Sequence, residues 1–208
     1  MISIAIPTGI LLPGSLELLR EAGVVRLDRE ELGRKLMVER DELRVVLVRP
    51  SDVAAYVDYG AADIGVVGKD SLWESVGSHY ELVDLKFGGC ALVMAVKESS
   101  PLDGPGTWPP LLRVATKYPR ATLTHMREAG QTVEVVPLHG SVELAPLVGL
   151  ADAIVDLTAT GRTLRENRLR IVDRLEQSTA RLIANQASLK TRSSEIQDVV
   201  TRIREVVA

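Results

Sequence analysis

A hydroxyl-rich loop follows an acidic residue in the C-terminal third of the chain. Asp156 ends an apolar run, and Leu-Thr-Ala-Thr-Gly-Arg-Thr leads from it into a helix-like segment. A strand that delivers such a loop to a helix N-terminus makes an anion site, because free backbone N–H groups and the helix dipole favour negative charge there. Thr160 and Thr163 add hydroxyl donors, and Gly161 lets the backbone approach the anion closely. Asp156 is placed for neutral hydroxyls or a metal beside the phosphate, so the segment indicates a ribose 5-phosphate site. The alternative is an ordinary strand, turn and helix.

Four charged residues elsewhere stand where strand-like runs end or helix-like runs begin: Arg49, Asp70, Lys117 and Glu143. A guanidinium at a strand end binds phosphate or carboxylate bidentately, which suits Arg49. Lys117 could pair with a phosphate, and the hydroxyl and amides near Glu143 would make a second anion site. Each residue also has a purely structural interpretation. For Arg49 it is a surface salt bridge and for Asp70 a helix start in a tight connection. For Lys117 it is a solvated turn, and for Glu143 a helix cap.

The sequence lacks the motifs of covalent and P-loop chemistry. It contains no G-x-S-x-G, no G-x-x-x-x-G-K-[ST] and no G-x-G-x-x-G. A reaction that needs positioned phosphates, a divalent metal and charge stabilisation therefore fits better than one with a protein nucleophile. Cys90 is the only cysteine, which excludes intrachain disulfides and cysteine metal clusters. The three histidines are scattered and form no metal motif.

Composition limits the class of protein. The chain has 208 residues, is 46% hydrophobic and carries a net charge of -3, which favours one large domain or two small lobes with ample core. The Lys and Arg residues are interspersed with acids and form no basic patch, so no nucleic-acid footprint is expected. The N-terminus reads as a strand and not as a signal peptide, and no apolar run reaches the ~20 residues that span a bilayer. We expect a cytoplasmic protein that binds neither nucleic acid nor membrane.

Strand-like and helix-like segments alternate along the chain, which predicts an α/β fold with mostly parallel sheets. We expect strands at 3–6, 45–48, 63–67, 82–85, 91–96, 113–116, 133–137 and 153–156. We expect helices at 15–22, 51–59, 69–73, 120–129, 142–148 and 193–207. Ser51 is the expected N-cap of the second of these helices, and 99–110 reads as a Pro- and Gly-rich loop.

Two sets of these units predict two lobes joined by two crossover strands. The pattern changes near 88–92, and a strand-like stretch returns near 174–184. Lobe I would contain 1–88 plus 179–208, and lobe II would contain 89–178 with the loop that follows Asp156. Strand C-terminal ends would then face a cleft between the lobes, where open α/β sheets place their ligands.

In this order the motifs resemble the ATP phosphoribosyltransferase family. The matching segments run along most of the chain, at 49–70, 87–90, 115–119, 140–167 and 178–185. The most specific match is Gly-Ser-Val-Glu-Leu-Ala-Pro at 140–146, which continues into Gly-Leu-Ala-Asp-Ala-Ile-Val-Asp at 149–156 and Thr-Gly-Arg-Thr-Leu at 160–164.

The resemblance implies an activity and a fold. Members transfer phosphoribosyl from phosphoribosyl pyrophosphate to N1 of the adenine of ATP, with Mg²⁺ and release of pyrophosphate, as the first step of histidine biosynthesis. The fold would be two-lobed and periplasmic-binding-protein-like (type II). The resemblance assigns catalytic roles to Asp156 and Arg49, and nucleotide binding to Arg49, Asp70, Lys117 and Glu143. It assigns phosphoribosyl pyrophosphate binding to Asp156, Thr158, Ala159, Thr160, Gly161, Arg162 and Thr163.

The resemblance also implies partners. The chain resembles the short form of the family because it ends one amphipathic helix after the second crossover. That form works as a homodimer within a hetero-oligomer, with a histidyl-tRNA-synthetase-like regulatory subunit that carries the histidine feedback site.

The chain departs from the family pattern at several basic positions. The usual Pro-Lys-Gly-Arg is replaced here by Pro-Thr-Gly-Ile, with Thr8 and Ile10 at the basic positions. The Arg that often follows Phe-Gly-Gly-Cys is Ala91, and Leu123 and Thr124 replace basic residues after the Tyr-Pro turn. The candidates to compensate are Arg113, Lys117, Lys69 or a partner subunit.

Two other classes compete with this interpretation. A non-catalytic bilobal solute-binding or sensing module would need an export signal or a DNA-binding helix-turn-helix, and neither is visible. A type I phosphoribosyltransferase typically carries two adjacent acidic residues before the phosphate loop, whereas this chain has only Asp156 after Val155.

Overall fold

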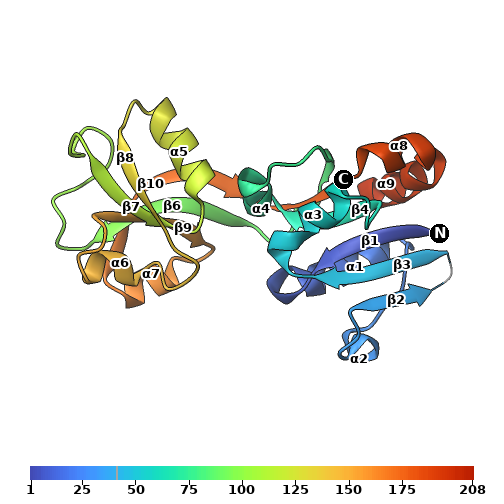
Figure 1. The fold of residues 1–208 in the computed structure, drawn as a ribbon. Helices are drawn as coiled ribbons and strands as arrows, with labels where there is room; N and C mark the ends of the chain where they lie inside the picture. The colour runs from blue at the N-terminus through green and yellow to red at the C-terminus, as the bar shows by residue number, and fades with distance from the viewer. Residues whose placement is uncertain (41) are drawn as a thin grey trace. The chain divides into compact units, whose positions relative to one another are not determined.

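The computed structural model describes residues 1–40 and 42–208, which divide into two compact units. Unit 1 comprises Met1–Gly88 and Thr179–Ala208, and unit 2 comprises Gly89–Ser178 (Figure 1). Each unit has its own sheet and its own apolar core. The predicted α/β class is therefore confirmed, and each unit is described by itself.

Three parallel strands form the middle of the unit 1 sheet. β1 pairs with β3 from Ile2↔Leu43 to Pro7↔Val48 and with β4 at Ile4↔Ile64, so all three strands end at the same edge. Antiparallel strands extend the sheet on both sides. In the described residues the strand order is β2 (Met37–Arg40), β3 (Leu43–Val48), β1 (Ile2–Pro7), β4 (Ile64–Gly68), β11 (Ala180–Ala184) and β5 (Tyr80–Asp84).

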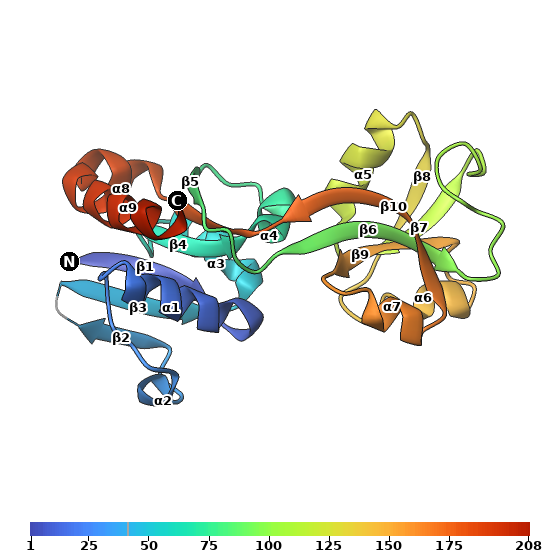
Figure 2. The same ribbon diagram turned by 180° about the vertical axis from the view of Figure 1, so that it is seen from behind.

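Helices cover both faces of the unit 1 sheet (Figure 2). On one face, α1 (Leu12–Glu21) and α9 (Ser193–Val207) bury apolar side chains against β1, β3 and β4. The predicted helical stripe of α9 is confirmed, with Ile196, Val199, Val200 and Ile203 buried. On the other face, α3 (Val53–Asp58) packs against Ala5, Val67 and Ile183. The remaining helices are α2 (Arg29–Leu32), α4 (Lys69–Glu74) and α8 (Gln186–Thr191).

Unit 2 has a mixed sheet whose parallel part again ends at one edge. Its strand order is β10 (Leu169–Ser178), β6 (Cys90–Lys97), β9 (Ala153–Thr158), β7 (Leu112–Thr116) and β8 (Val133–Pro137). β9, β7 and β8 run parallel, whereas β6 is antiparallel to both β9 and β10. One face is covered by α6 (Leu144–Leu147) and α7 (Arg162–Glu166), and α5 (Pro119–Glu128) lies on the other (Figures 1 and 2).

Several sequence predictions need correction. The sheets are mixed and not mostly parallel, because strands such as β6 and β11 return in the opposite direction. The helix predicted at 51–59 begins as a 3-10 turn at Pro50–Asp52, and the Ser51 hydroxyl donates to Asp52 (2.8 Å) instead of capping. The helix predicted at 142–148 is only Leu144–Leu147. The short elements β2, α2 and α8 were not predicted.

Asp63 is a buried carboxylate that ties the C-terminal helices to the unit 1 sheet. One oxygen accepts from the Ser3 amide (2.8 Å), the Ser3 hydroxyl (2.7 Å) and Arg192 Nη1 (3.1 Å), and the other accepts from Ser188 Oγ (2.7 Å). Burial by itself raises the pKa of Asp63, but the hydrogen bonds from Ser188 and Ser3 and the charge of Arg192 outweigh it. The pKa of the carboxyl is therefore held below its ordinary value.

We predict that Asp63→Asn lowers the free energy of unfolding by about 3 kcal/mol at pH 7, because the buried donors lose their charged acceptor. Since the folded-state pKa is depressed, this stabilisation is present above the unfolded-state pKa of about 3.9 and is lost as the pH falls through the folded-state value. Urea unfolding at a series of pH values should show that the free energies of unfolding of the wild type and of Asp63→Asn differ more as the pH rises. The matched control is Asp198→Asn, at an exposed carboxylate paired with Arg202 (2.7 Å). Equal losses in both variants would contradict the prediction.

Candidate functional site

The register between β7 and β9 brings two of the predicted site residues together. Ala115 pairs with Ile154 and Thr116 pairs with Val155. The next residues are Lys117, directly after β7, and Asp156, which pairs with Val93 inside β9 because that strand continues to Thr158 and does not end at Asp156 as predicted. Because side chains alternate along a strand, Asp156 belongs to the face that carries Ile154, and the Lys117 ammonium lies close enough to lower the pKa of Asp156.

The loop after Asp156 folds over its own hydroxyl groups. Thr158 Oγ1 accepts from the Gly161 amide (2.8 Å), and Thr160 Oγ1 accepts from the Arg162 amide (3.4 Å). Each hydroxyl keeps its own proton to donate, and the amides of the first turn of α7 have no carbonyl partner within the helix. The loop therefore offers hydroxyl and amide donors to an anion.

Gly161 has a conformational role that sequence analysis did not identify. Its φ is +71°, in the left-handed region that glycine adopts without a steric penalty. A Cβ at this position would lie 2.9 Å from Nη1 of Arg165. The Arg165 side chain therefore fills the space that a side chain at position 161 would need.

Asp156 interacts electrostatically with two other predicted residues. Burial raises the pKa of its carboxyl, and the nearby Glu143 carboxylate raises it further. The Leu157 amide, which donates to Asp156 Oδ1 (2.8 Å), and the Lys117 ammonium act in the opposite direction. The net effect is a pKa above the ordinary value, in a half-buried site that contains two carboxylates and one lysine.

Glu143 reaches this site from the segment before α6. It is the N-cap residue of α6, but its side chain makes no capping hydrogen bond, so the capping alternative is not what the structure shows. The neighbouring Val142 and Ala145 are buried in the unit 2 core and anchor the segment.

Arg49 and Asp70 lie in unit 1, each just beyond a parallel strand. Arg49 follows β3, is exposed, and its carbonyl accepts from the Asp52 amide (2.9 Å). Asp70 lies in the first turn of α4, directly after β4, and its carboxylate occupies the space where a Cβ of Gly68 would stand. Thr8 follows β1 at the same edge. Two of the predicted residues thus mark the carboxyl edge of unit 1, as Lys117 and Asp156 mark that of unit 2.

Of the basic residues proposed to compensate, Lys117 alone lies at the unit 2 edge. Arg113 is near the start of β7, at the opposite end of the strand, where its side chain pairs with Glu134 (3.5 Å). Lys69 pairs with Glu81 (2.5 Å) in unit 1. Ala91 pairs in register with Thr158, so the position where the family often has arginine lies beside the loop and is buried.

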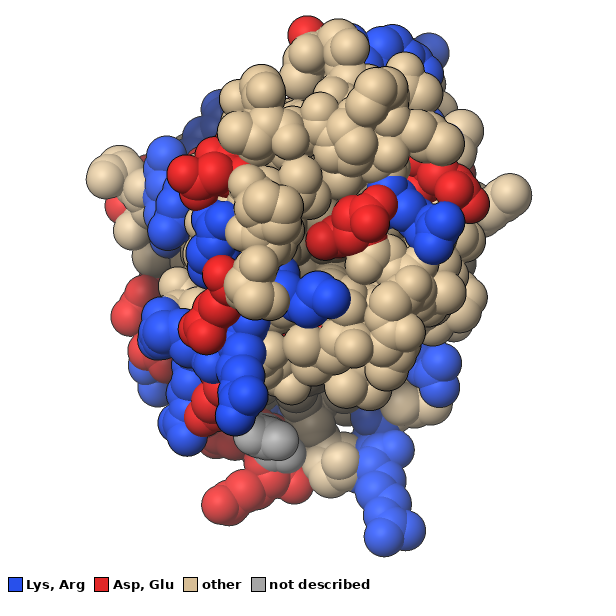
Figure 3. All heavy atoms as spheres, turned by 90° about the vertical axis from the view of Figure 1, so that its left-hand side faces the viewer, with Lys and Arg blue, Asp and Glu red and all other residues tan. Residues whose placement is uncertain are grey.

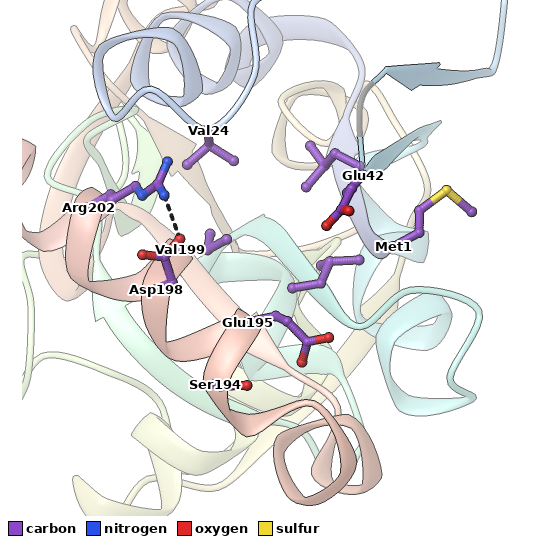
Figure 4. Close-up of a pocket in the computed structure, with 10 residues that line it drawn as sticks. Met1, Val24, Glu42, Ser194, Glu195, Asp198, Val199 and Arg202 are labelled. Carbon is purple, nitrogen blue, oxygen red and sulfur yellow. Dashed lines mark ion pairs between the residues drawn. The ribbon is translucent and has the colours of Figure 1, made fainter.

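A separate hollow of about 460 Å³ lies at the other edge of unit 1. Figure 4 shows α9 residues Glu195, Asp198 and Arg202 facing Met1 and Glu42, at the start of β1 and before β3. Arg202 pairs there with Asp198 (2.7 Å). None of the predicted site residues lines this hollow.

Charges of both signs share the face of unit 2 shown in Figure 3. Basic and acidic side chains lie next to one another in this view, with uncharged areas between them. No helix in the described part of the chain has the length and apolar character needed to cross a membrane.

Comparison with known proteins gives concordant matches. The family model described as ATP phosphoribosyltransferase matches residues 49–205. A protein of that name from Caldanaerobacter subterraneus subsp. tengcongensis is 43% identical over 209 residues, with 100% of this chain and 98% of that protein covered. One from Syntrophotalea carbinolica is 45% identical, with 100% and 95% covered.

Solved structures match in the same way. The ATP phosphoribosyl transferase (HisG:HisZ) complex from Thermotoga maritima matches with a TM-score of 0.82 and 33% identity, over 100% of this chain and 98% of that one. The periplasmic aliphatic sulphonate binding protein SsuA from Escherichia coli matches with a TM-score of 0.64 and 17% identity, over 98% and 67%. The second likeness concerns the fold alone and confirms the predicted periplasmic-binding-protein-like architecture.

Proposed function

The chain belongs to the ATP phosphoribosyltransferase family, and from this premise we propose that phosphoribosyl pyrophosphate binds at the carboxyl edge of the unit 2 sheet. The observation that carries the proposal is the β7–β9 register, which ends one residue before Lys117 and Asp156 and brings the two charges close enough to interact. The enzyme forms N1-(5-phosphoribosyl)-ATP and pyrophosphate. The competing solute-binding role is not favoured, because the relatives at 43–45% identity are named as the enzyme.

The donors of the loop match the 5-phosphate and ribose of this substrate. We assign the phosphate to the amides and hydroxyls of the loop, where the small Ala159 leaves the backbone accessible. Asp156 accepts hydrogen bonds from the ribose hydroxyls. The residues that contribute are Asp156, Thr158, Ala159, Thr160, Gly161, Arg162 and Thr163. For Arg162 the contribution is to hold the shape of the loop, because its amide donates to Thr160 Oγ1 (3.4 Å) and its exposed side chain pairs with Glu166 (2.8 Å).

The reaction requires charge stabilisation and alignment. The bond from C1 of ribose to pyrophosphate breaks, N1 of adenine bonds to C1, and the developing centre is oxocarbenium-like. Asp156, the proposed ribose ligand, lies near this centre, where its carboxylate would stabilise positive charge. We assign Arg49, Asp70, Lys117 and Glu143 to the nucleotide, with the two cations pairing with phosphate oxygens. Arg49 is also the proposed catalytic cation of unit 1.

Members of this family use a divalent metal, and we propose Mg²⁺ for this chain. Asp156 and Glu143 are close enough for one carboxylate to raise the pKa of the other, with Lys117 as the neighbouring cation. Adding phosphates to this site increases its negative charge, which a divalent cation offsets. Mg²⁺ typically binds one or two protein carboxylates and completes its shell with phosphate oxygens and water, which fits this donor pair.

We also propose that the chain assembles with a regulatory subunit. The Thermotoga maritima match is a complex of two different proteins, HisG and HisZ. By analogy, this chain would form a homodimer within a hetero-oligomer whose partner resembles histidyl-tRNA synthetase. Because the reaction consumes ATP, we place the enzyme in the cytoplasm.

The first test concerns turnover. When the chain is mixed with the partner, Mg²⁺, ATP and phosphoribosyl pyrophosphate, it should form N1-(5-phosphoribosyl)-ATP. Formation is measured by the absorbance of this product. Asp156→Asn should lower kcat by about 100-fold and change the Kd for phosphoribosyl pyrophosphate much less, because the carboxylate acts on the reacting sugar. The control is Asp152→Asn, whose carboxylate accepts from the Arg113 amide (2.9 Å) at the opposite strand ends. No product from correctly folded wild-type protein, or equal kcat in both variants, would contradict the assignment.

The second test concerns the loop. Gly161→Ala places a methyl group against Arg165 and the proposed phosphate position, so the Kd for phosphoribosyl pyrophosphate should rise at least about tenfold by calorimetry. The left-handed φ also costs about 1 kcal/mol of stability. Gly130→Ala is the matched control, because Gly130 has φ +68° and open space around its Cβ position. Both variants should lose similar stability, and normal affinity in Gly161→Ala would refute the loop assignment.

The third test concerns regulation. If the feedback site lies on the partner, histidine should leave the activity of the isolated chain unchanged and inhibit it only after the partner is added, since the coupling free energy requires the second site. Activity measured against histidine concentration, with and without partner, tests this. Strong inhibition of the chain alone would place an effector site within the chain itself.

A further inference from the structure

Two buried threonine hydroxyls hold the turn that carries Lys117. Thr116 is the last residue of β7 and Thr122 lies in α5, and both side chains are fully buried. Thr116 Oγ1 accepts from the Tyr118 amide (2.8 Å), and Thr122 Oγ1 donates to the Tyr118 carbonyl (2.7 Å). The two hydroxyl oxygens lie 3.5 Å apart. Both backbone groups of Tyr118 are therefore bound by threonine hydroxyls.

This arrangement differs from ordinary helix capping. The N-cap of α5 is Tyr118, whose side chain makes no capping hydrogen bond, and the helix begins with Pro119. The Thr116 bond instead spans Lys117 and closes a turn around it, as Ser and Thr hydroxyls do in ST-turns. The two threonine hydroxyls thus fix the backbone that carries Lys117 between β7 and α5.

Lys117 is consequently held from both sides. On its N-terminal side, Thr116 is paired with Val155, and its carbonyl accepts from the Leu138 amide (2.9 Å). On its C-terminal side, the peptide to Tyr118 is held by Thr116 Oγ1. Thr116 faces α5, as its contact with Thr122 shows, whereas the Lys117 ammonium lies close enough to Asp156 to lower the pKa of that carboxyl.

We propose that Thr116 and Thr122 are positioning residues for Lys117, acting through the backbone of Tyr118. The inference rests on the proposed role of Lys117 in binding the nucleotide phosphates. A long ammonium side chain binds phosphate well only if its backbone is fixed, because the freedom lost on binding is then smaller. The threonines provide that restriction without touching the substrate.

The test is a double-mutant cycle with KM for ATP as the readout. Lys117→Ala should raise KM. Thr116→Val, which keeps the shape and removes the hydroxyl, should raise KM about tenfold and change kcat by less than about twofold. In the Lys117→Ala background, Thr116→Val should have no further effect on KM, because residues that act through one another are not additive.

Three variants serve as checks on this cycle. Thr116→Ser restores the hydroxyl and should return KM to the wild-type value. Thr201→Val is the matched control, because Thr201 is an exposed threonine of α9 whose hydroxyl donates to the Gln197 carbonyl (2.8 Å), and its KM should be unchanged. If Thr116→Val fails to fold by circular dichroism, Thr122→Val replaces it, because the Tyr118 carbonyl keeps its bond from the Thr122 amide (3.0 Å). It should raise KM by a smaller factor.

The outcomes separate this inference from the proposed function. A KM increase from Thr116→Val that is the same in both backgrounds would mean a purely structural role and would overturn the inference. No increase from Thr116→Val and Thr122→Val, with a clear increase from Lys117→Ala, would overturn the inference alone. An unchanged KM in Lys117→Ala would overturn both the inference and the nucleotide role of Lys117.

Discussion

The register of β9 against β7 is the constraint on which the candidate site depends. With Thr116 opposite Val155, Lys117 and Asp156 come close enough to interact. Because side chains alternate, a slip of one residue would send Asp156 to the opposite face and expose Ile154. The apolar residues that fix the register therefore also fix the chemistry: Ala115 and Ile154 are fully buried in the same core as Val142 and Leu164.

Both units use the same geometric arrangement. In each, parallel strands end at one edge and the candidate residues lie near it: Arg49 and Asp70 shortly after β3 and β4 in unit 1, and Lys117 after β7 with Asp156 near the end of β9 in unit 2. The unit 1 hollow shown in Figure 4 lies at the opposite edge, among residues of α9 and the start of β1. In its lining Arg202 pairs with Asp198, and Glu42 and Glu195 lie nearby. At the unit 2 edge, in contrast, burial and the Glu143 carboxylate raise the pKa of Asp156.

Local sequence signals predicted most elements and the loop, because these depend on neighbouring residues. The strand at 133–137 and the helix at 193–207 were predicted with the observed bounds, since apolar spacing marks them directly. The mixed direction of the sheets could not be read in this way, because pairing joins residues far apart in the chain. The same limit applies to the site: the sequence identified Asp156, Lys117 and Glu143 separately, but their proximity depends on the fold. The left-handed φ of Gly161 and the hydroxyl bonds of Thr122 also depend on context.

The position of β11 has a consequence for the order in which the protein can fold. β11 lies between β4 and β5, yet it follows the whole of unit 2 in the sequence. During synthesis, β4 and β5 therefore emerge without the strand that joins them, and each exposes an unpaired edge. Unit 2 is a continuous segment and can fold first, whereas unit 1 completes its sheet and its Asp63 bonds only when Thr179–Ala208 arrives. The chain thus reaches its native state in a vectorial order, with unit 1 begun first and closed last.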